Sequence, residues 1–287
     1  MTRGPVVEVL VPADAQVGEG PFWEAGTGTI HWVDILAGKI YSSNLATART
    51  RTTTVPTAVG SAVPRRDGTR FVAGTADGFA YIDSDGRLDP ICYFLPPAIR
   101  MNDGKCDAMG RLWSGSTAYD FADGRGALHL LDETLTCRTV LDGLTQPNGL
   151  GWSPDNRTMY LVDSVTQDVS AFDFHLPSAT ISCRRTLLSL ADADGVPDGL
   201  AVDSTGCLWI ALWGGGAVVR ISPDGDVLER HEVPASQPTS CAFIGANLDV
   251  LAVTSARMGL QPGGLDGSIF AIRGLGTTGV PVSRFCL

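Results

Sequence analysis

Short apolar runs alternate with turn residues along this chain, and the combination recurs at nearly constant intervals. One copy begins at Asp198, continues through Gly199 into an apolar strand, turns over residues 203–206 and ends in a second apolar strand at Ala211. Five related copies begin at Glu19, Gly60, Asn102, Asn148 and Thr239. Successive starts are therefore 41, 42, 46, 50 and 41 residues apart.

Each copy is followed by a second pair of short strands, as at residues 78–83 and 217–222. A period of about 40–50 residues with several short strands per unit is typical of a β-propeller. Glycines (34) and prolines (17) interrupt the runs, so no segment keeps the apolar spacing of a helix for three turns. The sequence predicts an all-β fold, a single six-bladed β-propeller domain over residues 1–287. We expect strand 6–11 to pair with the last sheet and close the ring.

The composition narrows the choice of partners. With 44% hydrophobic residues, the chain can bury a large core between its sheets. Its net charge is −10, and the acidic residues are scattered through turns rather than massed in a tail. This balance argues against nucleic acid and anionic membranes as partners.

The cysteines and the N-terminal segment indicate a compartment. The seven cysteines form no C-x-x-C pair and are spread singly over the repeats, which favours free thiols in a reducing cytoplasm. A glutamate at position 8 precedes any signal-type apolar stretch, and the longest apolar run, 207–219, is broken by three glycines. We expect a soluble, cytoplasmic protein.

The residue at the first position of the repeat changes from copy to copy. In a propeller the innermost strand of each blade lines the central channel, so equivalent positions form a ring around the axis. The ring consists of Glu19, Gly60, Asn102, Asn148, Asp198 and Thr239. Two carboxylates in a narrow channel would repel each other and lose hydration, and a divalent cation resolves both problems.

Glu19, Asn148 and Asp198 are the candidate ligands of that cation. Oxygen ligands without histidine or cysteine favour Ca²⁺, Mn²⁺ or Mg²⁺, with Zn²⁺ and Fe²⁺ also open. Three protein ligands leave positions free for water and substrate, which suggests a catalytic rather than a structural ion.

Residues 96–105 form the densest polar cluster of the chain. Arg100, Asn102 and Asp103 together offer donors and acceptors for a polyhydroxylated molecule. The alternative is that Arg100 and Asp103 form a structural ion pair.

Two loops are expected on the same face as this cluster. Residues 119–126 are an insertion that could overhang it or form a plain surface loop, and residues 213–216 form a hairpin connection at its rim. Asp107, Asp155 and Asp203 lie in turns between strands and are interpreted as turn-forming residues.

Five short motifs occur in an order that resembles the senescence-marker-protein/gluconolactonase family, also called the regucalcin family. They lie at residues 18–21, 100–104, 147–155, 197–203 and 238–243. The resemblance runs from about residue 17 to the C-terminus and implies a six-bladed propeller that hydrolyses sugar lactones. It also implies a divalent metal ion bound by Glu19, Asn148 and Asp198, and substrate bound by Arg100, Asn102 and Asp103. Met101 departs from the residue more common in the family, which affects only the expected substrate preference.

This resemblance suggests a mechanism in carbohydrate catabolism. The metal would bind the lactone carbonyl oxygen and stabilise the tetrahedral oxyanion. Asp198 is the candidate base that activates water, and a metal-bound hydroxide is the competing version. Two other functions stay open. One is a metal-binding regulatory protein without turnover. The other is a propeller hydrolase of non-sugar esters, such as organophosphates or aryl lactones, for which an apolar mouth is expected.

Overall fold

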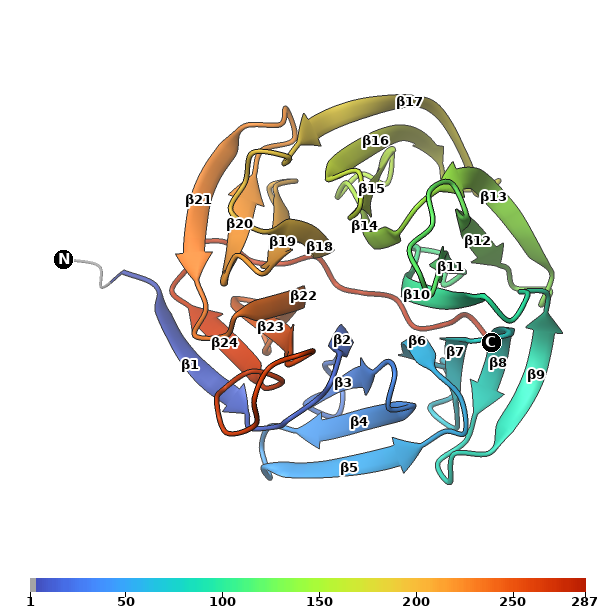
Figure 1. Ribbon diagram of the computed structural model, residues 1–287, viewed down its shortest axis with the longest axis horizontal. Coiled ribbons are helices and arrows are strands. Elements are labelled where there is room, and N and C mark those ends of the chain that lie inside the picture. Colours follow the sequence, from blue (N-terminus) through green and yellow to red (C-terminus); the bar gives the residue numbers. More distant parts are fainter. Residues whose placement is uncertain (1–3) are drawn as a thin grey trace.

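The computed structural model of the protein describes residues 4–287. Within this range, twenty-four strands form six four-stranded antiparallel sheets, and no residue lies in a helix. The sheets stand as blades around a central axis (Figure 1). The fold is therefore the six-bladed β-propeller that the repeat predicted.

In each of the first five blades, the strands run outwards from the axis in chain order. Blade 1 contains β2 (Gly18–Glu24), β3 (Thr29–Asp34), β4 (Lys39–Asn44) and β5 (Arg49–Thr54). Blade 2 contains β6 (Val59–Pro64), β7 (Phe71–Thr75), β8 (Gly78–Ile82) and β9 (Leu88–Tyr93). Blade 3 contains β10 (Ile99–Cys106), β11 (Leu112–Ala118), β12 (Gly126–Leu131) and β13 (Cys137–Leu144).

Blade 4 contains β14 (Pro147–Trp152), β15 (Thr158–Asp163), β16 (Asp168–His175) and β17 (Thr180–Ser189). Blade 5 contains β18 (Val196–Val202), β19 (Leu208–Trp213), β20 (Ala217–Ile221) and β21 (Val227–Glu232). Blade 6 contains β22 (Gln237–Ile244), β23 (Val250–Ala256) and β24 (Ile269–Arg273), and its outermost strand is β1 (Val6–Val11).

Blade 6 joins the two ends of the chain. Strand β1 pairs antiparallel with β24, with Val6 opposite Arg273 and Val9 opposite Phe270. This pairing confirms the expected closure of the ring, and it covers the edge that β24 would otherwise expose.

The core lies between neighbouring blades, where their apolar faces meet. Trp113 of blade 3 packs edge-on against Trp152 and Phe174 of blade 4, with ring centroids 6.2 and 5.8 Å apart. Trp209 of blade 5 meets Phe243 of blade 6 in the same way at 5.8 Å. Aromatic pairs in this geometry add to the burial that holds the ring together.

Every inner strand is interrupted by a β-bulge at or beside the first position of the repeat. The register shifts after Glu19 in β2, after Pro147 in β14 and after Pro197 in β18. The other three inner strands shift at the equivalent place. A bulge bends a strand and re-aims its side chains, which fits the position of these residues around the axis.

Glycine follows the first position where neighbouring inner strands come closest. A Cβ atom on Gly199 of β18 would overlap the Ser240 side chain of β22. A Cβ atom on Gly149 of β14 would overlap the backbone nitrogen of Leu200 in β18. These contacts explain why the repeat places glycine here, since only a residue without a side chain fits.

The turn aspartates organise the far ends of the inner strands. Asp203 is fully buried and accepts hydrogen bonds from two backbone N–H groups of its own turn, from Trp209 Nε1 (3.1 Å) and from Arg220 Nη2 (2.8 Å). Asp107 makes the equivalent set of bonds in blade 3. Asp155 is exposed and accepts from one backbone N–H of its turn at 3.1 Å. All three hydrogen-bonding patterns agree with the turn-forming interpretation.

The expectation that the cysteines are free thiols is wrong for one pair. A disulfide joins Cys92 of β9 to Cys137 of β13, 45 residues along the chain. This separation is close to one repeat, and each residue lies on the outermost strand of its blade, so the propeller brings the two together. The other five cysteines are free in the described range, and Cys106, Cys207 and Cys241 are buried as small apolar side chains.

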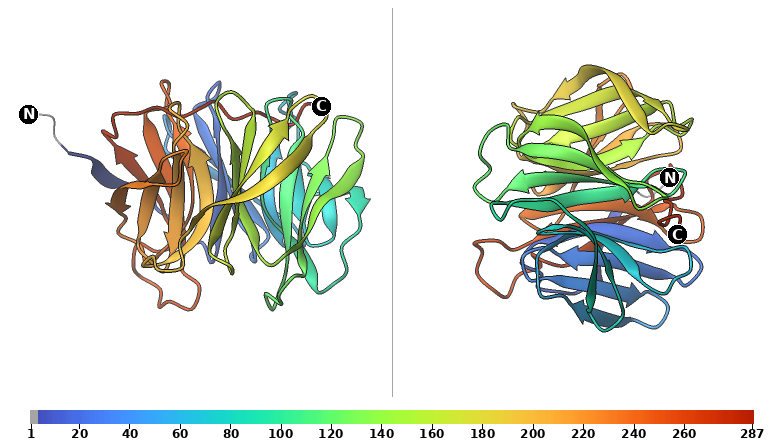
Figure 2. Two further views of the ribbon diagram at one scale, coloured as in Figure 1. Left: turned by 90° about the horizontal axis from the view of Figure 1, so that it is seen from above. Right: turned by 90° about the vertical axis from the view of Figure 1, so that its right-hand side faces the viewer.

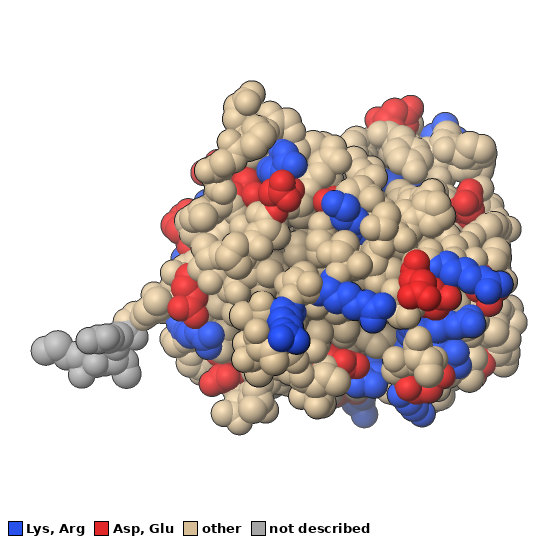
Figure 3. All heavy atoms as spheres, turned by 90° about the horizontal axis from the view of Figure 1, so that it is seen from below, with Lys and Arg blue, Asp and Glu red and all other residues tan. Residues whose placement is uncertain are grey.

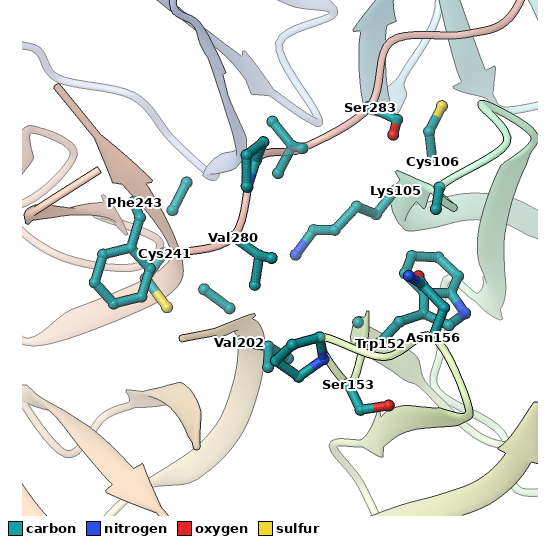
Figure 4. A pocket seen from close by; sticks show the side chains of 17 residues that line it. Lys105, Cys106, Trp152, Ser153, Asn156, Val202, Cys241, Phe243, Val280 and Ser283 are labelled. Atoms are coloured by element: carbon teal, nitrogen blue, oxygen red, sulfur yellow. The ribbon is translucent and has the colours of Figure 1, made fainter. Parts of the chain in front are cut away.

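The two faces of the disc differ. The C-terminal segment, residues 274–287, crosses one face, while the longest loops project from the opposite face (Figure 2). The segment is held by hydrogen bonds from Ser204 N to Thr278 O (2.8 Å) and from Phe285 N to Pro64 O (3.0 Å). Beside it lies a cavity of about 130 Å³, into which the Lys105 amine projects (Figure 4).

On the side of the disc drawn in Figure 3, acidic and basic side chains are interspersed, with uncharged surface between them. Residues 4–287 contain no helix that is long and apolar enough to cross a membrane.

Candidate functional site

A second hollow, the mouth cavity, opens where the inner strands begin. Its volume is about 420 Å³. Its buried floor is polar and consists of Glu19, Arg100, Asn102, Asn148, Ser164 and Asp198. The cavity beside the C-terminal segment is lined instead by the last residues of β10, β14, β18 and β22, so the two cavities lie at opposite ends of the inner strands.

The three predicted metal ligands come together on this floor from blades 1, 4 and 5. The Glu19 Oε2 atom accepts a hydrogen bond from Gly20 N at 2.7 Å. Asn148 donates from Nδ2 to Ser164 Oγ at 3.1 Å, which orients its amide group. The Asp198 Oδ1 atom is buried and has no hydrogen-bond partner in the described range. Such an orphaned oxygen is costly to bury, which suits a ligand position.

Burial and mutual repulsion both disfavour the charged forms of the two carboxylates on the floor. Burial, and then the neighbouring charges of Asp198 and Asp103, raise the pKa of Glu19 well above its usual value. Burial and Asp103 likewise raise the pKa of Asp198. Negative charge is therefore unfavourable at both residues unless a cation is close by. Perturbed carboxylates that share a cavity are typical of functional sites.

Arg100 and Asn102 form a connected pair on the same floor. Arg100 Nη1 donates to Asn102 Oδ1 at 2.8 Å and to Met101 O at 3.0 Å, and Asn102 Nδ2 donates to Pro147 O at 3.1 Å. The Arg100 guanidinium also lies 5.9 Å from the ring centroid of Tyr119. Both side chains are thus fixed before any ligand arrives, as recognition of a polar substrate requires.

Asp103 lies elsewhere. It does not line the mouth cavity but a narrow hollow of about 20 Å³, together with Lys105 and Ser240. Its Oδ1 atom accepts from Gly104 N at 2.7 Å, and its buried Oδ2 atom has no partner among the described residues. Among the described residues neither Asp103 oxygen bonds to Arg100, so the two do not form the alternative ion pair. Contact between Asp103 and a substrate stays a prediction.

The two remaining ring positions carry no ligand. Thr239 is fully buried and donates from Oγ1 to Gly18 O, joining blade 6 to blade 1. Gly60 allows the backbone of β10 to approach, since a Cβ atom there would lie 2.5 Å from Met101 O. Both positions therefore contribute to the packing of the inner strands and supply no side chain to the floor of the cavity.

The candidate metal site would consist of two carboxylates and one amide. Residues 4–287 contain no group of three histidine, cysteine, aspartate or glutamate side chains placed to hold a metal ion. An amide oxygen is an ordinary ligand of Ca²⁺, however, and the all-oxygen donor set with the orphaned Asp198 Oδ1 fits a hard divalent ion.

The walls of the mouth cavity include residues that the repeat did not reveal. Ser164, which orients Asn148, follows β15 and matches no repeat position. Phe121 and Trp213 lie in the two segments expected at the rim, and both line the cavity. Leu36, Val165 and Met258 also line it from loops whose length and sequence vary between blades.

Comparison with known proteins agrees with this fold. Residues 17–257 match the SMP-30/gluconolactonase/LRE-like region. Regucalcin of Pongo abelii is 34% identical over 297 residues, an alignment that covers 96% of each chain. A solved luciferin-regenerating enzyme is similar with a TM-score of 0.93 at 30% identity, covering 99% of this chain and 100% of that one. A solved regucalcin from Agrobacterium tumefaciens, described as a calcium-binding protein, gives a TM-score of 0.92 at 27% identity over 98% of each chain. With a family match over most of its length and a relative of this identity, the chain belongs to the SMP-30/gluconolactonase/LRE-like family.

Proposed function

We propose that this protein is a lactone hydrolase that opens a sugar lactone to the corresponding hydroxy acid, with a divalent ion held by Glu19, Asn148 and Asp198. The supporting observation is that these three oxygen ligands share one cavity floor with the fixed pair Arg100 and Asn102. The gluconolactonases of the family and the calcium-binding regucalcin support the substrate class and the ion.

An ion at this position would supply Lewis acidity toward the lactone carbonyl. Calcium is the first ion to test, because a similar protein is described as binding it, and Mn²⁺, Mg²⁺, Zn²⁺ and Fe²⁺ follow. The ion would also offset the buried charges of Glu19 and Asp198, whose pKa values burial raises.

The protein's own groups would carry the remaining steps. Arg100 and Asn102 would orient the ring through the donors that they do not already use. Asp198 is the proposed base that accepts a proton from the attacking water. The water oxygen then bonds to the carbonyl carbon, the ring C–O bond breaks, and the proton ends on the departing ring oxygen. Burial raises the pKa of Asp198 in the metal-free protein, and a bound ion would lower it again, so a hydroxide held by the ion is the competing base.

The test measures hydrolysis of a panel of aldonolactones near neutral pH, detected through the acid that each reaction releases. We expect turnover that a chelator removes and that Ca²⁺ or Mn²⁺ restores. Asp198→Asn should lower kcat by about a hundredfold or more. Asp192→Asn changes an exposed carboxylate in the loop before β18 and should leave kcat unaltered.

Two results would change the assignment. Full activity in Asp198→Asn would remove this residue from the mechanism. Tight binding of a divalent ion with no turnover of any lactone would favour a metal-binding regulatory protein.

A further inference from the structure

The mouth cavity has two chemically different zones. Beyond the polar floor, its walls carry apolar side chains from Val17, Ile35, Leu36, Val196, Trp213 and Met258, joined by Phe121 and Val165. Four of them, which we call the apolar rim, are Leu36, Phe121, Val165 and Met258. The rim residues are between 39% and 49% exposed, so they border the entrance rather than the core.

The rim is assembled from four separate loops. Each of its residues lies between the second and third strands of a different blade: Leu36 in blade 1, Phe121 in blade 3, Val165 in blade 4 and Met258 in blade 6. Of the thirteen large hydrophobic residues exposed in residues 4–287, these four line one cavity. Two more, Tyr119 and Leu265, lie in the same loops. Convergence of this kind marks a binding surface, since scattered exposed apolar residues are ordinary.

The Phe121 loop is held by a tight turn. Phe121 N donates a hydrogen bond to Ala118 O at 3.1 Å, and the backbone φ of Phe121 is 54°. Seven other non-glycine residues of the described range have a φ between 50° and 63°, so this value belongs to an ordinary turn. The turn places the aromatic ring beside the cavity.

The polar floor and the apolar rim would contact different parts of one ligand. The floor matches a lactone carbonyl and ring oxygens, through Arg100, Asn102 and the proposed ion site. Gln146 and Gln167 also line the cavity, but the four rim side chains themselves offer a hydroxyl group no hydrogen-bond partner. An alkyl chain there would remove its own apolar surface, and that of the rim, from water.

We propose that the preferred substrate is a lactone that carries an apolar substituent, with the ring on the polar floor and the substituent against Leu36, Phe121, Val165 and Met258. This inference rests on the proposed hydrolysis of lactones and changes the preferred substrate from an unsubstituted sugar lactone to a lactone that carries an apolar group. The cavity volume of about 420 Å³ is of the size that binds small organic molecules.

The experiment measures kcat/KM for δ-lactones whose alkyl chains increase in length, beside an aldonolactone. For the wild-type protein with its metal, kcat/KM should rise about two- to fourfold per methylene group until the rim is covered. In Phe121→Ser and in Val165→Ser this dependence on chain length should become markedly weaker. Leu228→Ser removes an equally exposed apolar side chain from the outer strand β21, far from the cavity, and should keep the wild-type dependence.

Binding of the corresponding lactams, measured by calorimetry, separates this inference from the proposed function. A protein that hydrolyses no lactone but binds longer-chain lactams more tightly, in a way that Phe121→Ser abolishes, would refute catalysis and support the apolar substituent. A protein that prefers the aldonolactone, with no chain-length effect on hydrolysis or lactam binding, would overturn the inference and leave the lactonase function intact.

Discussion

Two buried aspartates at the ends of β18 should respond in opposite ways to the same substitution. Asp198 is 7% exposed and has an orphaned Oδ1 atom, and burial together with Asp103 raises its pKa. Asp203 is 0% exposed but satisfied by Trp209, Arg220 and two backbone N–H groups, and these partners outweigh burial and lower its pKa. We predict that Asp198→Asn stabilises the metal-free protein and that Asp203→Asn destabilises it.

The magnitudes follow from the partners. Neutralising Asp198 removes a buried charge that repels Asp103 and Glu19, and relief of such strain at a functional site is worth about 0.5–2 kcal/mol. The gain is limited because Arg100 loses one of its compensating charges. Neutralising Asp203 breaks a buried ion pair with Arg220, whose loss costs about 3–5 kcal/mol. The lower end is expected, because Arg220 keeps Glu229 as a second partner at 2.8 Å.

The assay is thermal and denaturant unfolding of both variants in the presence of chelator near neutral pH. For a chain of this size, about 1 kcal/mol corresponds to roughly 2 °C in Tm. Tm should therefore rise by about 1–4 °C in Asp198→Asn and fall by about 6–10 °C in Asp203→Asn. If both variants lose stability to a similar extent, Asp198 is a structural residue, and the case for a strained ion site at the axis fails.

Three further predictions concern the ion, the strand contacts and the disulfide. Since burial raises the pKa of Glu19 and Asp198 in the folded protein, the unfolded chain releases these protons at lower pH. The stability of the metal-free protein, measured by thermal unfolding, should therefore fall as pH rises above the ordinary carboxyl range. Ca²⁺ at a hundred times its Kd should add about 2.7 kcal/mol of stability. A Tm that Ca²⁺ leaves unchanged contradicts this prediction. Gly199→Ala should cost about 1–3 kcal/mol in urea unfolding because the new methyl group overlaps the next inner strand, whereas Gly26→Ala, with open space around it, serves as the control. Cys92→Ser should cost about 2–4 kcal/mol, and a reductant should lower the Tm of the wild-type protein to that of the variant; no effect of reductant would show that the disulfide does not form.

The fold and the floor of the site were predictable because both follow the repeat. The spacing of first positions gives the number of blades, and propeller geometry gives the ring of Glu19, Asn148 and Asp198. Residues at equivalent positions of a closed ring must meet, whatever their separation along the chain. The turn aspartates could be interpreted for the same reason, since each recurs between two strands.

The placement of Asp103 was not predictable from clustering in the sequence. Successive side chains of a strand point to opposite sides, and the bulge in β10 disturbs this alternation between Met101 and Gly104. Asn102 consequently reaches the mouth cavity while Asp103 lines a separate hollow. Three polar neighbours in the sequence thus divide between two environments.

The disulfide and the apolar rim were missed for a different reason. Cys92 and Cys137 lie on outer strands, where neighbouring blades have no fixed sequence signal for contact. The rim residues, such as Leu36 and Met258, lie in loops outside the repeated pattern. Only the three-dimensional arrangement of the blades brings them together.

The seam between blades 6 and 1 has a consequence for how the protein is made. Glu19 is synthesised early and Asp198 much later, and the strand that bears Glu19 is fastened to blade 6 through Thr239 only after nearly the whole polypeptide has emerged. The proposed ion site is therefore complete only when the ring has closed. An ion bound there by Glu19 and Asp198 would connect blade 1 to blade 5 across the axis.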